Sequence, residues 1–561
     1  MRRSDAARWG VQTEYVDATG TRRTVPQRSV RAVLDALGAD GAAPPGEPSG
    51  ARRGPVARCH PAPERGWGWA AQLYALRSRR SWGMGDLDDL AALGRWASGL
   101  GASMLMLNPL HAPQPWLPQE ASPYFPLSRL FRNPLYLRVE AIPGATESPL
   151  VRRLQREGRA LNASPVIQRD AIFALKMQAL EHLWTRFGGD RRFDAYCASE
   201  GEALLRYATH CVIAEQRRKP WRQWPRALQS PGSAAVRRIA ERERRRVDFH
   251  RWLQWQTDTQ LARAARTIPL VHDLAVGTSP DGADAWMWHD VMAFGARIGA
   301  PPDEFSPGGQ NWGLVPFDPH RLRDAGYRPL REMLHRLLRL GAGVRIDHVM
   351  GLFRLWWIPA ESDARGGAYV RYPWHELLDV IAEESARASA YVVGEDLGTV
   401  ETGVRAQLRR RGVLSYRVMW FERARPERYP VEAMAAMTTH DLPTVTGVWT
   451  GADIDELAAS GRPINLEAEL RLRRRLRRLT ALPDRAPTSS VVERAYAELG
   501  AAPSRLLSVT LEDAAAAPRR PNLPGATERD NWSLPLPLTL DQLRRSTLAR
   551  NIAATMRAAG R

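Results

Sequence analysis

Short apolar runs alternate along most of the chain with longer stretches of helical periodicity. The apolar runs lie at 69–77, 103–110, 268–273, 341–347, 390–396, 413–421, 433–441 and 506–514. Most follow a stretch, such as 327–341 or 374–388, whose apolar residues are spaced for one face of a helix. This alternation is typical of parallel strands joined by helices. Eight such strands predict an α/β fold, the (β/α)8 or TIM barrel.

Two regions do not follow this alternation. Residues 112–266 are too long for one crossover between strands, so we predict an inserted, mostly helical subdomain there. Near the start, a helical stripe at 29–38 is followed by a Pro/Gly-rich stretch at 41–55, which indicates a linker. We therefore expect a short N-terminal helical extension with its linker at 1–65 and a catalytic barrel at 66–561.

Composition indicates a globular chain in a reducing compartment. Of 561 residues, 44% are hydrophobic and 25% are charged, which excludes a disordered or collagen-like chain. No apolar run approaches the ~18–20 residues that a membrane span needs, and the N-terminus lacks the apolar segment of a secretory signal. Three cysteines form neither a disulfide framework nor a zinc spacing. We expect a cytoplasmic protein that has no membrane partner.

The formal net charge of +19 raises the alternative of a polyanion-binding protein. The densest basic segments are 237–251 and 471–479, and nearly all of the cations are arginine. In the second segment Leu472, Leu476 and Leu479 define one apolar helical face, which leaves the arginines on the solvent face. Glutamates in the first segment are spaced for ion pairs. No nucleic-acid motif accompanies either segment, so we interpret both as surface helices and expect no nucleic-acid partner.

Candidate chemistry lies at the ends of the predicted strands. Four acids end separate apolar runs: Asp273, Asp347, Glu395 and Asp441. A single acid at such a position is more often a helix cap. Four of them converge on one barrel mouth, where catalytic residues of this fold lie. Paired carboxylates can cleave a glycosidic bond, one attacking the anomeric carbon and one protonating the leaving oxygen, so we expect no metal and no cofactor.

Basic residues adjoin two of these acids. Arg345 precedes Asp347 by two residues, so both side chains point to one face of a strand. The guanidinium is expected to favour the ionised carboxylate. His348 and His440 could donate hydrogen bonds to substrate hydroxyls, or could be structural histidines bonded to backbone carbonyls.

Three segments around these acids resemble signature regions of glycoside hydrolase family 77, the 4-α-glucanotransferases or amylomaltases. They are VRIDHVMGLFRLWWIP (344–359), VVGEDLGTV (392–400) and TTHDLPT (438–444). Further segments match in order at 81–90, 108–112, 122–137, 281–286, 301–313 and 520–532. The resemblance spans roughly residues 66–535.

The resemblance implies a role for each matching residue. Asp347 matches the nucleophile, Glu395 the general acid/base and Asp441 the transition-state stabiliser, while Asp273, Arg345, His348 and His440 match a surrounding polar shell, and Tyr124 and Trp312 match aromatic sugar contacts. The implied reaction transfers a 1,4-α-glucan segment to the 4-hydroxyl of an acceptor glucan or glucose through a covalent glucosyl-enzyme. The implied substrates are maltooligosaccharides and glucans derived from starch or glycogen. We expect loop 301–313 to cover the site, and the protein to be a monomer or homodimer.

A retaining hydrolase of the α-amylase type is the alternative, because it would use the same three acids. The segments FSPGGQNWG and SPYFPLSRLFRNPLYL, which resemble family 77, favour the transferase. Two departures from the family pattern are present. HDLAVG at 272–277 resembles a variant in a subset of the family. The additional β-rich N-terminal domain of long relatives does not fit within 1–65.

Overall fold

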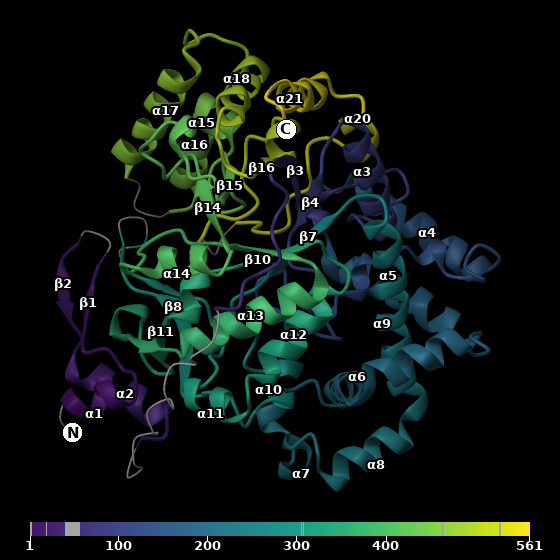
Figure 1. The fold of residues 1–561 in the computed structure, drawn as a ribbon. Coiled ribbons are helices and arrows are strands. Elements are labelled where there is room, and N and C mark those ends of the chain that lie inside the picture. The colour runs from purple at the N-terminus through teal and green to yellow at the C-terminus, as the bar shows by residue number, and fades with distance from the viewer. Residues whose placement is uncertain are drawn as a thin grey trace.

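Eight parallel strands form a closed barrel at the centre of the protein (Figure 1). The structure is a computed structural model that describes residues 3–17, 20–39, 56–303, 306, 308–461, 465–526 and 529–561. The barrel strands are β3 (Gly66–Ala71), β4 (Met104–Leu107), β7 (Leu270–Leu274), β10 (Gly343–Ile346), β13 (Tyr391–Gly394), β14 (Leu414–Val418), β15 (Ala433–Ala436) and β16 (Leu506–Thr510). Each overlaps one predicted apolar run, although β3 begins before position 69. The predicted (β/α)8 barrel is confirmed.

The strands are mostly apolar because a parallel barrel buries both faces of most strands. Trp67 and Trp69 of β3 are both completely buried, and so are Val392 and Val393 of β13. Gly68 lies where β3 approaches β4 most closely, since a Cβ atom there would come within 2.2 Å of the carbonyl oxygen of Met104. Close contact between these two strands therefore requires glycine.

Helices surround the barrel, and several lie directly before or after a strand. Seven of them are α3 (Leu87–Gly99), α9 (Arg244–Ala265), α12 (Arg328–Leu338), α13 (Trp374–Ala388), α14 (Val404–Arg410), α18 (Thr488–Gly500) and α21 (Thr547–Ala558). Shorter or more peripheral helices are α10 (Ala283–Met287), α11 (Pro319–Asp324), α15 (Val445–Thr450), α16 (Ala452–Ala459), α17 (Leu466–Thr480), α19 (Leu511–Ala514) and α20 (Leu540–Leu543). On α17, Leu476 is fully buried while Leu472 and Leu479 pack against the core, which confirms the predicted apolar face. None of the helices in the described ranges combines the length and apolar character needed to cross a bilayer.

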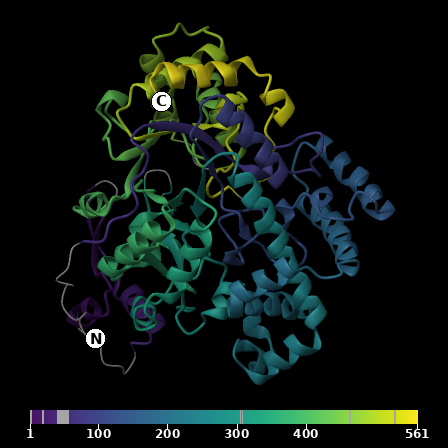
Figure 2. The same cartoon turned by 45° about the vertical axis from the view of Figure 1, so that its right-hand side comes forward.

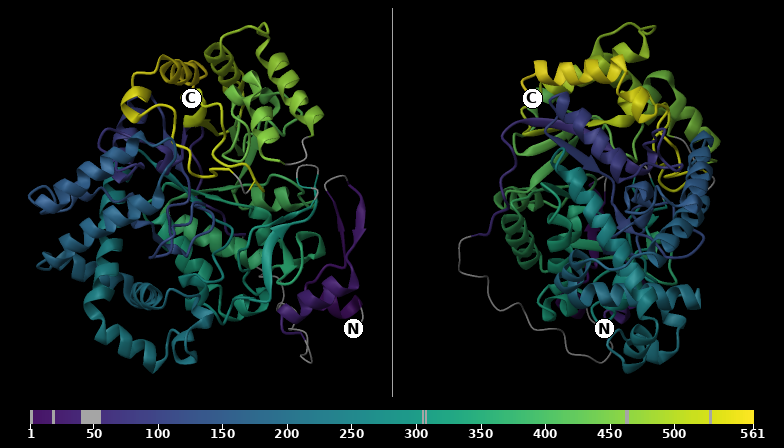
Figure 3. Two further views of the ribbon diagram at one scale, coloured as in Figure 1. Left: turned by 180° about the vertical axis from the view of Figure 1, so that it is seen from behind. Right: turned by 90° about the vertical axis from the view of Figure 1, so that its right-hand side faces the viewer.

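The long connection between β4 and β7 contains a hairpin followed by six helices. The hairpin strands are β5 (His111–Ala112) and β6 (Ser128–Arg132), and the helices are α4 (Pro149–Ala160), α5 (Arg169–Thr185), α6 (Arg191–Arg217), α7 (Arg226–Gln229), α8 (Ala234–Arg242) and α9. These helices lie to one side of the barrel, on the right in Figure 1 and on the left when seen from behind in Figure 3. The last of them, α9, packs on α3 and leads back into the barrel.

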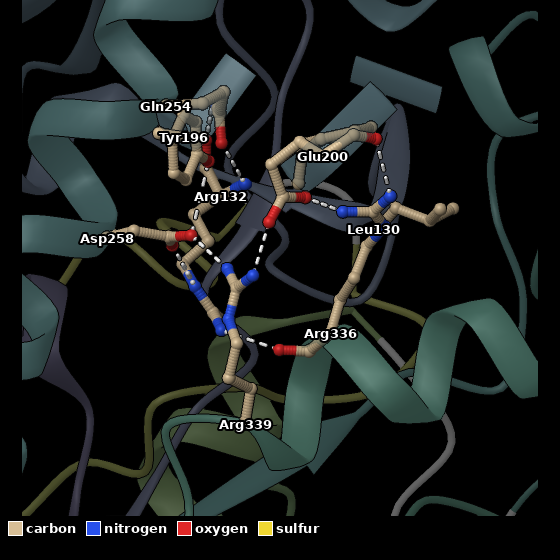
Figure 4. Close-up of a pocket in the computed structure, with 9 residues that line it drawn as sticks. Leu130, Arg132, Tyr196, Glu200, Gln254, Asp258, Arg336 and Arg339 are labelled. Atoms are coloured by element: carbon tan, nitrogen blue, oxygen red, sulfur yellow. Dashed lines mark hydrogen bonds and ion pairs between the residues drawn. The ribbon is translucent and has the colours of Figure 1, made fainter. Parts of the chain in front are cut away.

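A cluster of ion pairs, which we call the α6–α12 cluster (Arg132, Glu200, Asp258, Arg336 and Arg339), joins the inserted helices to the barrel (Figure 4). Glu200 pairs with Arg336 and Arg339 of the α12 region, and Arg132 Nε lies 3.0 Å from Asp258 Oδ1. Helix α6 kinks at Gly201 (φ 59°), and the carbonyl of Glu200 accepts a hydrogen bond of 3.1 Å from Arg336. These residues line a small pocket, and they form ion pairs with one another. We therefore assign the α6–α12 cluster an anchoring role.

Glu200→Ala is expected to destabilise the protein by about 3–5 kcal/mol, the usual cost of leaving a buried charge without its partner. Its side chain is 3% exposed and faces two arginines. The midpoint and slope of urea-induced unfolding would measure the change. Glu202→Ala on the same helix removes an ion pair with Arg206, in which the glutamate side chain is 62% exposed. The unfolding midpoint of this variant should match that of the wild type within error. Equal midpoints for both variants would contradict the anchoring role.

A second sheet lies beside the barrel, and the hydrophobic pattern does not predict it. Its strands are β8 (Ala296–Ala300), β9 (Gln310–Asn311), β11 (Arg354–Pro359) and β12 (Ala368–Arg371), paired antiparallel in the order β12-β11-β8-β9. Strands β8 and β9 precede β10 in the chain, whereas β11 and β12 follow it. Strand β8 ends directly before loop 301–313, and β9 lies within it.

The N-terminal elements pack against this sheet. They comprise α1 (Arg3–Arg8), the hairpin β1 (Glu14–Val16) and β2 (Arg22–Thr24), and α2 (Gln27–Ala36). Helix α2 overlaps the predicted helix at 29–38, whereas the hairpin is a feature that the prediction lacks. Val11 forms an antiparallel bridge with Val370 of β12. These elements and the C-terminal helix α21 lie at opposite ends of the molecule (Figures 1, 2 and 3). The predicted linker at 41–55 lies outside the described residues.

Candidate active site

The four predicted acids lie at the carboxyl ends of barrel strands. Asp273 is within β7, Asp347 and Glu395 directly follow β10 and β13, and Asp441 lies in the loop after β15. Because β7, β10 and β13 are neighbours in register, the first three acids lie on adjacent strands. The backbone N–H of Asp347 donates to Leu274, and that of Glu395 donates to Ile346, at 3.1 and 3.0 Å. The barrel therefore fixes both main chains at one mouth.

Arg345 connects two of the acids, of which its position in β10 predicts only Asp347. Its Nη1 lies 2.7 and 2.8 Å from the two carboxylate oxygens of Asp273, and its Nη2 lies 3.0 Å from Asp347 Oδ1. Arg345 and Asp273 are buried, while the side chain of Asp347 is 21% exposed. The arginine thus orients the Asp347 carboxylate and leaves its other oxygen for a substrate.

Burial determines how Asp347 titrates. It raises the pKa of Asp347 to about 6, with Asp273 adding to the increase and Arg345 opposing it. Arg345 shares its charge with Asp273, so it does not hold this pKa at the ordinary value for aspartate. Asp347 is still mostly ionised at pH 7, as a nucleophile must be.

Glu395 has a higher pKa than Asp347. Its Oε2 accepts a hydrogen bond from the backbone N–H of His348 at 2.9 Å, and its Oε1 accepts one from that of Leu397 at 2.8 Å. Burial raises the pKa of Glu395 to about 7, and the nearby charge of Asp347 acts in the same direction. A carboxyl group with this pKa can both donate and accept a proton near neutral pH.

A second group of polar and aromatic side chains surrounds Asp441. Tyr124 donates its hydroxyl hydrogen to Asp273 Oδ2 at 2.6 Å, and this hydroxyl also lies 3.3 Å from His440 Nδ1. His440 Nε2 lies 3.4 Å from Asp441 Oδ2. Burial lowers the pKa of His440, but the charge of Asp441 and the hydrogen bond to it together produce a net rise. Burial raises the pKa of Asp441, but its interactions with His440, Asn522 and Arg345 together produce a net decrease. The Asp441 side chain is 42% exposed, so it faces the open mouth.

Trp312 and His348 lie together on the β8–β9 side of the mouth. Their ring centroids are 5.2 Å apart, with the rings nearly perpendicular. The indole N–H of Trp312 donates to Gln310 Oε1 at 3.1 Å. Burial lowers the pKa of His348 to about 4, which keeps its imidazole neutral at pH 7. In loop 301–313, residues 304, 305 and 307 lie outside the described part of the chain.

Two residues at the mouth were not singled out from the sequence. Asn522 donates from Nδ2 to Asp441 Oδ1 at 2.7 Å. The ring of Trp532 lies 5.3 Å from that of Tyr124 and 5.1 Å from that of His440. Both residues belong to the segment RPNLPGATERDNW (520–532). Its match to the family pattern was the signal that could have identified them.

The pKa values of about 6 and about 7 predict a bell-shaped pH profile for kcat/KM with these two apparent values. Activity should fall on the acidic side as Asp347 takes up a proton, and on the alkaline side as Glu395 loses one. Initial rates on maltotriose across the pH range would measure both limbs, with circular dichroism at each pH as the control for folding. A single limb, or a rate that is flat from about pH 5 to pH 9, would contradict this pair of titrating groups.

Comparisons with known proteins show which family the sequence and the fold resemble. The model of a family described as 4-alpha-glucanotransferase matches residues 71–539. The chain is 42% identical over 544 residues to a 4-alpha-glucanotransferase of Mycobacterium tuberculosis, covering 88% of this chain and 75% of that protein. It is 36% identical over 425 residues to one of Haemophilus influenzae, covering 69% of this chain and 61% of that protein.

Solved structures show a similar fold. The amylomaltase from Corynebacterium glutamicum superposes with a TM-score of 0.86 at 27% identity, over 99% of this chain and 100% of that chain. An amylomaltase from Streptococcus agalactiae, solved in complex with acarbose, has a TM-score of 0.72 at 17% identity and covers 89% of this chain and 99% of that chain. The second likeness concerns the fold alone.

Proposed function

The chain belongs to the 4-alpha-glucanotransferase family, glycoside hydrolase family 77, and we propose that Asp347, Glu395 and Asp441 carry out the retaining glucan transfer of that family. The observation that carries this assignment is the pair of carboxyl groups directly after the adjacent strands β10 and β13, with Arg345 bound to Asp347 and with both pKa values raised by burial. Two carboxyl groups tuned in this way are the equipment for general acid and nucleophile in one site. The alternative hydrolase reading is not favoured by the comparisons.

In the first half-reaction, a carboxylate oxygen of Asp347 attacks the anomeric carbon of the donor glucan. The bond from that carbon to the leaving 4-oxygen breaks, and Glu395 gives its proton to this oxygen. Asp441, kept ionised by His440 and Asn522, is placed to accept hydrogen bonds from hydroxyls of the sugar whose bond is cleaved. The product is a covalent glucosyl-Asp347 and a shortened glucan.

In the second half-reaction, the 4-hydroxyl of an acceptor glucan gives its proton to the Glu395 carboxylate. Its oxygen attacks the anomeric carbon, and the bond to Asp347 breaks. Substrate contacts are assigned to the remaining predicted residues, which are Tyr124, Asp273, Trp312, Arg345, His348 and His440. Of these, Asp273 and Arg345 are buried and act mainly by fixing Asp347 and Tyr124.

Maltotriose incubated with the protein tests the proposal directly. Transfer should release glucose while maltodextrins longer than maltotriose accumulate, and products resolved by size would show both. Reducing sugar that rises without longer products would indicate hydrolysis and overturn the proposed function.

Trp312→Ala is expected to raise the ratio of hydrolysis to transfer by about tenfold, because the indole would hold the acceptor and exclude water from the glucosyl-enzyme. Trp312 is partly buried at the end of loop 301–313 and adjoins His348. Product analysis on maltotriose would measure the ratio. Trp312→Phe keeps an aromatic face and should stay close to the wild type. An unchanged ratio in the alanine variant would remove Trp312 from this role.

We propose a cytoplasmic location for this protein. All three cysteines are free thiols and are buried, which agrees with the expected cytoplasmic location. We keep the proposed division into an extension at 1–65 and a catalytic unit at 66–561, and the expectation of a monomer or homodimer that binds no nucleic acid. Gel filtration with light scattering would determine the oligomeric state.

A further inference from the structure

A C-terminal segment, residues 519–526 and 529–532, lies beside the barrel mouth and is bound by one glutamate. Glu456 of α16 has a side chain that is 7% exposed. Its Oε1 accepts hydrogen bonds from Arg519 Nε at 2.7 Å and from Arg529 Nε at 2.9 Å. Its Oε2 lies 3.8 Å from Arg520 Nε. Three arginines of one segment therefore share a single carboxylate, and we call this group the Glu456 clasp (Glu456, Arg519, Arg520 and Arg529).

The same segment contacts Asp441 at two places. Asn522 donates from its side chain to Asp441 Oδ1 at 2.7 Å, and from its backbone N–H to the carbonyl of His440 at 3.0 Å. Arg520 Nη1 donates to the carbonyl of Asp441 at 3.3 Å. Both the carboxylate and the main chain of Asp441 are therefore set by this segment.

The segment has little regular structure of its own. Among its described residues, no helix or strand lies between α19, which ends at Ala514, and α20, which begins at Leu540. Arg529 holds it together instead, donating to the carbonyl of Pro521 at 3.3 Å and to Asn531 Oδ1 at 2.5 Å. A loop of this kind depends on side-chain anchors for its position.

Glu456 is the shared acidic partner of Arg519 and Arg529. The side chains of Arg520 and Arg529 are only 7% and 5% exposed, so each guanidinium needs a nearby negative charge. Glu469 and Asp453 also act on Arg520 electrostatically, and Glu469 acts more strongly than Glu456 does. Arg519 and Arg529 both donate hydrogen bonds directly to Glu456 of α16.

We infer that Glu456 is a positioning residue for the transfer reaction. It holds residues 519–526 and 529–532 in place, so that Asn522 and Arg520 keep Asp441 directed at the sugar whose bond is cleaved. The inference rests on the role proposed above for Asp441. Glu456 itself lies in α16, outside the loop that carries Asp441, and acts only through the segment.

Glu456→Gln keeps the shape of the side chain and removes its charge. It is expected to lower kcat for maltotriose disproportionation by about tenfold with little change in KM, because a small displacement of a reacting group is costly. Asn522→Ala should lower kcat at least as much. In the double variant the fold losses should be less than the product of the two single losses, since both changes affect the Asn522 contact and only the Arg520 contact is left for Glu456→Gln to weaken. Glu498→Gln on α18 removes a remote pair with Arg494 (2.7 Å) and should leave kcat unchanged.

Two results would overturn the inference: a kcat for Glu456→Gln equal to that of the wild type, or fold losses that multiply in the double variant. If Glu456→Gln does not fold, Arg519→Gln replaces it in the same set of single and double variants. The side chain of Arg519 is 44% exposed, so this change tests the clasp from its exposed side. Asp441→Asn is measured in parallel. If Asp441→Asn were fully active, the proposed function itself would be overturned. If Asp441→Asn were inactive and the kcat losses of Glu456→Gln and Asn522→Ala multiplied in the double variant, only the positioning role of Glu456 would be overturned.

Discussion

Asp347→Asn is expected to lower kcat for maltotriose disproportionation by about 10⁴-fold or more, in the range seen when a catalytic nucleophile is removed. The asparagine amide can still accept a hydrogen bond from Arg345 Nη2, which now lies 3.0 Å from Asp347 Oδ1. It cannot form the covalent bond to the anomeric carbon. Rates from product analysis over long incubations would measure the loss.

The fold of this variant should be preserved or strengthened. The pKa of Asp347 is about 6 in the folded protein, above its ordinary 3.8, so the ionised form that prevails at pH 7 lowers the free energy of unfolding. A neutral side chain removes that cost, and thermal unfolding at pH 7 should occur at the same temperature or higher. Asp190→Asn, at the surface N-terminus of α6, serves as the matched control with wild-type activity. Near wild-type turnover by Asp347→Asn would show that the nucleophile is wrongly assigned.

Glu395→Gln is expected to lower kcat on maltotriose by about 10³-fold, within the usual contribution of general acid–base catalysis. The defect should depend on the leaving group. With α-maltosyl fluoride as donor, fluoride leaves without a proton, so the first half-reaction should recover most of its rate. The second half-reaction still lacks its base, and the glucosyl-enzyme should therefore accumulate.

Intact-protein mass spectrometry would detect this accumulation as one added maltosyl unit per chain. Glu432→Gln removes a glutamate that pairs with Arg505 (3.0 Å) beside the amino ends of β15 and β16, away from the catalytic mouth, and should neither slow turnover nor trap a maltosyl unit. If Glu395→Gln is equally slow with the fluoride and with maltotriose, the residue has another role, such as orienting Asp347.

The barrel could be predicted because its signal is local. Most strands are buried on both faces, so VVG at 392–394 or MLML at 104–107 is recognisable from composition alone. The second sheet could not be predicted in this way. Its strand β9 contains only Gln310 and Asn311, and both are polar. Asn311 pairs with Gly299 of β8, and the sequence of the loop between these two strands shows no pattern typical of a strand.

The acids of the site were also visible from the sequence, whereas their environment was not. Strand ends marked Asp347 and Glu395, and the spacing of two residues placed Arg345 beside Asp347. No spacing could show that Arg345 divides its charge with Asp273, so that burial dominates the pKa of Asp347. Asn522 reaches Asp441 from 81 residues away along the chain, through a loop without regular structure. Contacts of that kind depend on the finished fold.

The closure of the barrel bears on how the chain folds as it is synthesised. Strand β3 pairs with β16, with Gly66 opposite Leu506 and Ala70 opposite Thr510. One edge of β3 must therefore wait, without a partner, until β16 has left the ribosome. An unpaired edge rich in tryptophan is a site for wrong pairing with other chains. The protein is thus expected to depend on protection of this edge during translation, and shortening the chain before β16 would leave it permanently open.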